Sequence, residues 1–247
     1  MRHIKNYKEL FETQTELSQE QIKWLDKCTN GKWNLNPQTG LVDVKGDFDC
    51  PDLNLTDFKG VRFGVVTGRF DCSRNRLTSL EGAPQKVGKS FYCEENSLTS
   101  LEGAPQEVGK GFGCSNNSLT SLKGAPTEVG YNFFCSNNML TSLVGAPKKV
   151  GPYFICSKNA LTSLEGAPLS GGLYGFEAEE NPVSERTLKG IYKKMQSGLS
   201  WPDVVANFWR YIRSEEDKIM LAQYNPKLSP EDVKGYQALA KFRNKII

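Results

Sequence analysis

Most of the cysteines in this chain recur at a fixed interval, and that interval constrains the fold more than any other feature of the sequence. From Cys72 to Cys156 each cysteine follows the previous one by 21 residues, and Cys50 precedes Cys72 by 22 residues. A fixed period of this length is typical of solenoids, in which each repeat is one coil stacked on the next. The periodic cysteines are Cys50, Cys72, Cys93, Cys114, Cys135 and Cys156.

The repeated unit gives each position of the coil a physical role. It reads V-G-x-x-F-x-C-x-x-N-x-L-T-S-L-x-G-A-P. The Phe and the Cys are two residues apart, so both side chains point to one face of a short strand, which we expect to be the solenoid interior. The Asn three residues later sits where the strand must turn, and its amide can bond the backbone of neighbouring coils. The two Leu residues close the interior from the other side.

The remainder of the coil and its two ends follow from the same pattern. The Gly-Ala-Pro segment is too short and too broken for a helix, so we expect loops or short turns there and a slim, weakly curved solenoid. Leu53 replaces the Asn of the first coil, and Ala178 replaces the Cys of the last. Atypical terminal repeats are expected because each end coil must also meet a cap. The sequence therefore predicts about six to seven coils over residues 46–183.

The pattern F-x-C-x-x-N-x-L resembles the L-x-L-x-x-N-x-L signature of leucine-rich repeats over residues 41–183. The short period and the Pro-bearing segment are similar to the short-repeat class found in bacterial effectors. The near-identical units resemble those of proteins encoded by bacteriophages. The resemblance implies an α+β chain, in which a leucine-rich-repeat β-solenoid lies between two caps. It says little about function, because one fold hosts many functions.

Composition argues against most enzyme classes and sets expectations about location. The chain has one histidine, His3, and no clustered Cys and His pairs, so the sequence predicts no catalytic residue, no metal and no cofactor. Stacked cysteines would lie ~4.8 Å apart, whereas a disulfide needs Cβ atoms ~3.8 Å apart, so we expect reduced thiols. Reduced thiols and an N-terminus without an apolar signal sequence predict the host-cell cytoplasm or a virus particle. No apolar run reaches a membrane-spanning length, so no membrane contact is expected.

The two flanks differ from the repeat and are expected to form caps. Residues 1–45 carry a capping-box signature at Ser18–Gln21 and a turn signal at Asn36–Gly40, which predict a helix followed by a β-hairpin. Residues 184–247 are expected to form a helical cap or module, whose first helix covers the open end of the last coil. Helices are predicted to begin at Ser184, Ser200 and Ser229.

The helical segment also carries an excess of basic residues. It contains 12 Lys+Arg against seven Asp+Glu, and several of the lysines follow Ser184 closely. A basic helical surface can contact phosphates or an acidic partner, which keeps a nucleic-acid-binding or enzymatic role of this segment as an alternative. The solvated surface of a cap is the interpretation that the sequence favours, because charged side chains normally lie in solvent.

The outward positions of the strands have no role in the core, and such faces bind partners in repeat proteins. Exposed aromatic clusters are typical of interface hot spots, although the C-terminal helices could instead fold back and bury them. The candidate partner-binding residues are Tyr92, Tyr131, Phe134, Tyr153, Ile155 and Tyr174. A secondary candidate surface in the N-terminal coils is charged and consists of Asp47, Asp49, Arg69, Asp71 and Arg74.

These features favour a non-catalytic protein–protein interaction module, encoded by a phage, that binds a host or viral protein through the outward strand face. A structural component of a virus particle, assembled through both faces of the solenoid, is the first alternative. A nucleic-acid-binding or enzymatic C-terminal module is the second. A shift of nucleic acid that weakens with salt would distinguish that alternative.

Overall fold

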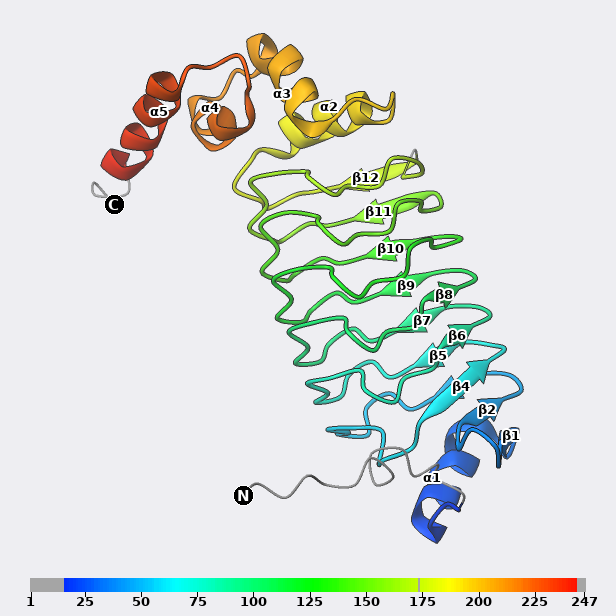
Figure 1. The fold of residues 1–247 in the computed structure, drawn as a ribbon. Coiled ribbons are helices and arrows are strands. Elements are labelled where there is room, and N and C mark those ends of the chain that lie inside the picture. The colour runs from blue at the N-terminus through cyan, green and yellow to red at the C-terminus, as the bar shows by residue number, and fades with distance from the viewer. Residues whose placement is uncertain (1–15, 173, 244–247) are drawn as a thin grey trace, which may run out of the picture.

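The computed structural model describes residues 16–172 and 174–243 and shows a column of stacked coils with helices at both ends (Figure 1). Each coil adds one short strand to a seven-stranded parallel sheet, which we call the Phe sheet because every strand contains the repeated Phe. This arrangement confirms the predicted β-solenoid. The strands in spatial order are β3 (Phe48–Asp49), β5 (Phe70–Asp71), β7 (Phe91–Tyr92), β9 (Phe112–Gly113), β10 (Phe133–Phe134), β11 (Tyr153–Ile155) and β12 (Gly175–Glu177).

A second sheet lies beside the first, and within the repeated coils it occupies a region where only loops and turns were predicted. We call it the Val sheet, because the repeated Val of each coil lies buried in it or in the bridges that extend it. In four coils a charged residue precedes the Val, as Lys86 precedes Val87, and this short alternation places one side chain in solvent and the next in the core. Its strands are β1 (Trp33–Leu35), β2 (Val42–Val44), β4 (Phe63–Val66), β6 (Lys86–Val87) and β8 (Glu107–Val108).

The solenoid core is a continuous stack of the repeated Phe rings. Successive ring centroids lie 4.7 to 5.9 Å apart, with the ring planes nearly parallel. An aromatic residue from each cap closes the stack. Trp24 packs edge-on against Phe48 at 5.4 Å, and Tyr192 stacks on Phe176 at 4.0 Å. The ladder cysteines and both Leu positions surround the rings and are fully buried, as the sequence predicted.

The repeated Asn joins each coil to the one before it, as predicted. Asn117 is representative: its Nδ2 donates to the carbonyl of Cys93 in the preceding coil at 3.0 Å and to the carbonyl of Cys114 in its own coil at 3.2 Å. Its Oδ1 accepts from the backbone N–H of Leu98 at 3.0 Å. The same side chain therefore satisfies backbone groups that the turn leaves without partners.

The N-terminal cap matches its prediction closely. Helix α1 (Gln19–Thr29) begins with a capping box at Ser18 and ends at Asn30, which has a left-handed backbone with φ 53°. Strands β1 and β2 form the predicted antiparallel hairpin, and β2 then pairs in parallel with β4. The hairpin is therefore part of the Val sheet.

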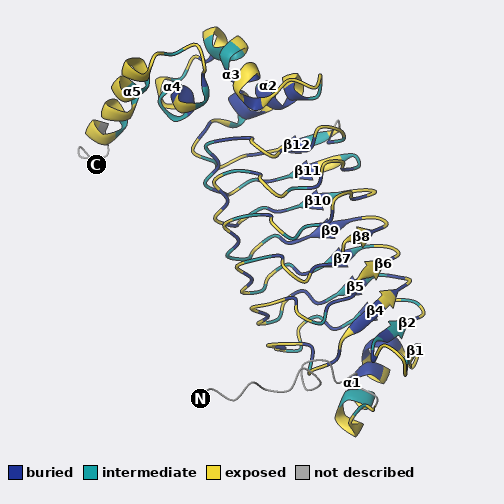
Figure 2. Ribbon diagram, viewed as in Figure 1, coloured by how far each residue is buried: buried dark blue, intermediate teal, exposed yellow. Residues whose placement is uncertain are grey.

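The C-terminal region contains the three predicted helices and one more. The predicted helices are α2 (Glu185–Met195), α3 (Trp201–Phe208) and α5 (Pro230–Arg243), and α2 packs on β12. Helix α4 (Glu215–Leu221) was missed, although Ser214 caps it by accepting from the backbone N–H of Asp217. Short 3₁₀ segments follow α3 and α4 at Trp209–Tyr211 and Ala222–Tyr224. Figure 2 shows that α5 is largely exposed, whereas α2 buries the side facing the solenoid.

All seven cysteines are buried free thiols, which confirms the predicted reduced ladder. Burial raises the pKa of the Cys28 thiol to about 11 and the pKa of each ladder thiol further. We expect a thiol reagent to titrate seven thiols per chain in denaturant and almost none in the native protein at pH 8. A total of five or fewer in denaturant, with no reductant present, would contradict the reduced ladder.

Candidate binding face

The outward face of the Phe sheet is open to solvent along its length. The cap helices lie at the two ends of the column and leave the face uncovered (Figure 1). Three of the predicted aromatic residues are exposed: Tyr131 by 51%, Tyr153 by 39% and Tyr174 by 84%. The C-terminal helices therefore do not bury these three side chains, which removes one of the two readings of this face that the sequence left open.

The six predicted partner-binding residues occupy two kinds of position. Tyr153 and Ile155 on β11, Phe134 on β10 and Tyr92 on β7 are on strands, and the last three are half-buried by their neighbours. Phe134 lies directly opposite Ile155 in the parallel register. The other two residues do not lie on strands, contrary to the prediction. Tyr131 and Tyr174 precede β10 and β12 in the bend between the two sheets, because the Phe strands are only two or three residues long.

The secondary, charged set lies at the N-terminal end of the same sheet and is largely paired within itself. Arg69 donates two hydrogen bonds to the Asp49 carboxylate, at 3.0 and 2.9 Å, and the backbone N–H of Arg69 donates to Asp47 at 2.7 Å. Arg74 pairs with Asp52 at 2.9 Å. These pairs are solvent-exposed, so water screens them and each contributes little to stability. The arginines already have carboxylate partners, which makes this end the weaker candidate.

A hollow of about 400 Å³ lies in the Phe sheet between these two regions. Strand β9 has Gly113 at its outward position and Gly111 directly before it, so no side chain rises from this part of the coil. Tyr92 on β7 and Phe134 on β10 flank Gly113 in register and form the two sides of the hollow, which we call the β9 trough. Its lining consists of Asp71, Ser73, Arg74, Tyr92, Glu94, Glu95, Ser115, Asn116 and Phe134.

The carboxylate of Glu94 lies over Gly113 at the floor of the β9 trough. A Cβ atom at position 113 would collide with this carboxylate, so the glycine is required for the side chain to lie there. Ser73 and Ser115 occupy the position equivalent to Glu94 in the coils on either side. The sequence analysis did not identify Glu94. The sequence did contain a signal for this site. Glu94 is charged at a position where four other coils carry serine, and the next coil has glycine at the outward position of its strand.

The environment of Glu94 disfavours its charge. Burial raises the pKa of this carboxyl to about 7, and the negative charges of Asp71 and Glu95 act in the same direction, whereas its own backbone N–H and Arg74 act against them. No ion pair involves Glu94 in the part of the chain that the structure describes. The trough therefore holds a half-buried carboxylate that forms no ion pair with a cation.

Replacing Glu94 with glutamine should stabilise the protein at alkaline pH. The folded pKa of about 7 is above the ordinary value of 4.5, so the folded state holds the proton more tightly than the unfolded state. The stability conferred by protonation is complete below pH ~4.5, decreases between pH ~4.5 and ~7, and is absent above that. At pH 8 we expect Glu94→Gln to raise the free energy of unfolding by about 1–3 kcal/mol. Urea unfolding at pH 8 and pH 4.5 measures this, and an equal effect at both values would contradict the assignment.

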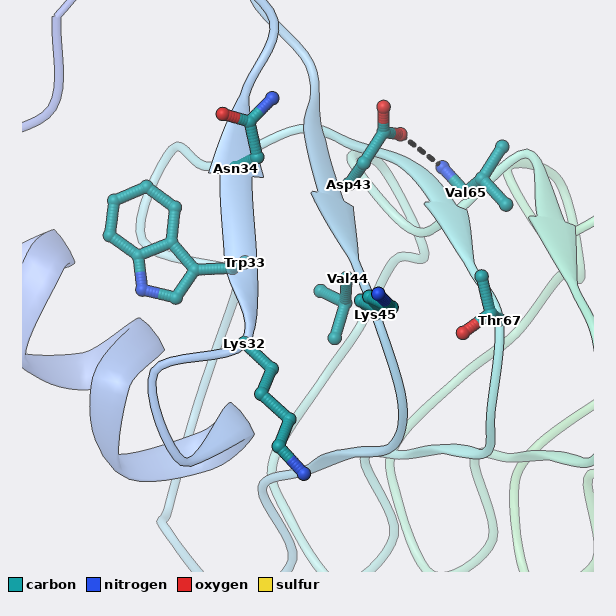
Figure 3. A pocket seen from close by; sticks show the side chains of 8 residues that line it. All are labelled: Lys32, Trp33, Asn34, Asp43, Val44, Lys45, Val65 and Thr67. Carbon is teal, nitrogen blue, oxygen red and sulfur yellow. Dashed lines mark hydrogen bonds between the residues drawn. The ribbon is translucent and has the colours of Figure 1, made fainter.

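The other hollows described here are weaker candidates for a binding site. One of about 470 Å³ lies on the Val sheet, where Figure 3 shows side chains that point in different directions instead of converging. Asp43 there already accepts from the backbone N–H of Val65 at 2.7 Å. Another, of about 500 Å³, lies between the last coil and α2 beside Tyr174, and Lys189 at its edge is paired with Glu185 at 2.8 Å.

Comparison of the chain with protein-family models, with curated proteins and with solved structures finds no match. The site must therefore be judged on its own chemistry. Within residues 16–172 and 174–243, no three His, Cys, Asp or Glu side chains are grouped so that they could hold a metal ion. None of the helices in that part of the chain has the length and apolar character needed to cross a bilayer.

The basic residues of the helical module do not converge on a site. Lys193 and Lys194 are exposed near the end of α2, and Lys189 forms an ion pair within the same helix. Lys241 is exposed on α5, at the opposite end of the module. Separate exposed lysines of this kind fit the solvated surface of a cap.

Proposed function

We propose that this chain is a non-catalytic protein-binding module and that the aromatic end of the outward Phe-sheet face binds the partner. We further propose that the repeat is of the leucine-rich-repeat type, that a bacteriophage encodes the protein, and that the partner is a host or viral protein. The resemblance of F-x-C-x-x-N-x-L to the L-x-L-x-x-N-x-L signature and the Asn contacts between coils support the repeat type. The near-identity of the units supports the phage origin.

One observation carries the proposed function: exposed aromatic side chains gather on the Phe sheet and on the bend beside it, where no other part of the described chain covers them. Tyr131, Tyr153 and Tyr174 lie at the bend and edge of neighbouring coils, beside the half-buried Phe134 and Ile155. Leaving such side chains in water gains no burial energy, and aromatic residues on an exposed rigid face are typical of binding hot spots. The parallel sheet holds them in fixed positions, which lowers the entropy lost on binding.

Affinity capture with matched variants tests the proposal. Immobilised wild-type protein and Asp49→Ala should retain the same protein from a lysate of phage-infected bacteria, and the Phe134→Ala/Tyr153→Ala variant should lose it. Asp49 is the control because it lies on the outward face of the same sheet, at the charged end. Equal retention by all three proteins, or selective retention of nucleic acid, would contradict the proposal. Recovery of a protein of the virus particle would favour a role in the particle.

A further inference from the structure

We propose that the β9 trough is a subsite for an arginine side chain of the protein partner. The inference rests on the proposed function, because it assigns a chemical feature of the partner to one part of the same face. The trough lies between the aromatic end and the charged end of that face, so a bound chain that covers Phe134 also passes over it.

A carboxylate without a cation is the first reason. The Glu94 carboxylate at the floor forms no ion pair within the described part of the chain. Arg74, the one cation lining the trough, donates from Nε to both carboxylate oxygens of Asp52, at 3.0 and 2.9 Å. A ligand that brings several N–H donors and a positive charge would pair with the Glu94 carboxylate.

The shape of the trough is the second reason. Tyr92 and Phe134 are two strand positions apart, so their Cα atoms are separated by about 10 Å, with only glycine between them. A cation that lies against an aromatic ring is attracted to the ring face, and the planar guanidinium does so while it donates two parallel hydrogen bonds to a carboxylate. Lysine offers a point charge without this flat, forked arrangement. An arginine side chain therefore fits the walls and the floor together.

The departure from the repeat is the third reason. A serine at position 94 and a side chain at position 113 would reproduce the neighbouring coils, yet the chain has a glutamate and a glycine at these adjacent positions. Burying a carboxylate without a cation is unfavourable, and glutamine would fill the same space without that cost. A cationic ligand accounts for a carboxylate at this position, because the attraction between the carboxylate and a cation is strongest where water is largely excluded.

Binding of small probe peptides tests the subsite without knowledge of the partner. The probes are acetyl-Gly-Arg-Gly-amide, its citrulline analogue, which has the same shape without the charge, and its lysine analogue. Titration at pH 8, followed by amide NMR shifts, should show saturable changes confined to β7, β9 and β10 with the arginine peptide. We expect at least tenfold weaker binding of the citrulline peptide, and weaker binding of the lysine peptide than of the arginine peptide.

Two variants and a change of pH locate the effect at Glu94. Glu94→Gln should weaken binding of the arginine peptide at least tenfold. Glu95→Gln, which also removes one charge from the trough, should change the affinity for this peptide less than about threefold. The charged and titratable groups that face Glu94 are Asp71, Tyr92, Arg74 and Glu95. Because the Glu94 carboxyl is mostly protonated below pH 7, wild-type binding should fall at least tenfold from pH 8 to pH 5.5, and Glu94→Gln should lose this dependence.

Three results would overturn the inference. They are the absence of saturable shifts in the wild-type protein, equal binding of the arginine and citrulline peptides, and equal losses in Glu94→Gln and Glu95→Gln. None of these results bears on the proposed function, which depends on capture by the aromatic residues. Conversely, the Phe134→Ala/Tyr153→Ala variant could retain the captured protein, which would contradict the proposed function. Peptide binding in the trough would then still be measured by the same titration. Thermal melting of both variants confirms that each is folded.

Discussion

Replacing Phe133 with alanine is expected to lower the free energy of unfolding by about 3–5 kcal/mol. The Phe133 ring is fully buried, and it stacks between Phe112 at 5.5 Å and Phe154 at 5.7 Å. Its loss removes a large apolar surface from the core and leaves a cavity that neighbouring coils cannot fill, because their own rings are held in register by the strands on either side. Urea unfolding at pH 7 measures the change.

The next residue along the strand provides the matched control. Phe134 has the same side chain on the same strand, but it points to the outward face and is half-buried. We expect Phe134→Ala to lower the free energy of unfolding by about 1 kcal/mol or less. Similar losses in the two variants would show that the outward position carries part of the core, and the aromatic face would then have a structural role.

Replacing Asn117 with alanine should cost about 1–3 kcal/mol, because it leaves several buried backbone groups without partners at once. The Asn117 side chain binds the carbonyls of Cys93, Cys114 and Ser115 and accepts from the backbone N–H of Leu98. Two of these groups belong to the preceding coil, so the side chain links adjacent coils directly.

A nearby exposed residue separates this effect from a general loss of polarity. Thr120 lies three residues further along the same coil, with its side chain in solvent, and Thr120→Ala should change the free energy of unfolding by less than about 0.5 kcal/mol. An unchanged unfolding midpoint for Asn117→Ala would mean that water can replace the side chain, and the Asn ladder would then not be a structural element.

The repeated positions made the core of the fold predictable. Phe, Cys, Asn and the two Leu positions recur with constant spacing, and constant spacing in a stacked coil means identical environments, so one coil defines the others. The strands β6 and β8 of the Val sheet were missed because each is only two residues long and closely follows Gly-Ala-Pro, which indicates a turn. The α4 helix was missed because it is short, although Ser214 and Asp217 form a helix start of the same kind as those recognised at Ser184 and Ser200.

The candidate site was less predictable, because it depends on contacts between side chains of different coils. Alternation along the strand correctly placed Phe134 and Ile155 on the outward face, but the sequence could not show whether the C-terminal helices covered it. The β9 trough depends on a side chain from one coil that lies over a glycine of the next. Glu94 and Gly113 are 19 residues apart in the sequence and adjacent only in the stacked structure.

The most direct test of the proposed binding face is a calorimetric titration of the captured protein against three forms of this chain. Wild type and Asp49→Ala should bind with affinities within about threefold of each other. Phe134→Ala should bind about 30-fold more weakly, the equivalent of ~2 kcal/mol for a hot-spot aromatic, while it melts close to the wild-type temperature. Unchanged affinity in Phe134→Ala, or a larger loss in Asp49→Ala, would contradict a binding face centred on the aromatic end of the Phe sheet.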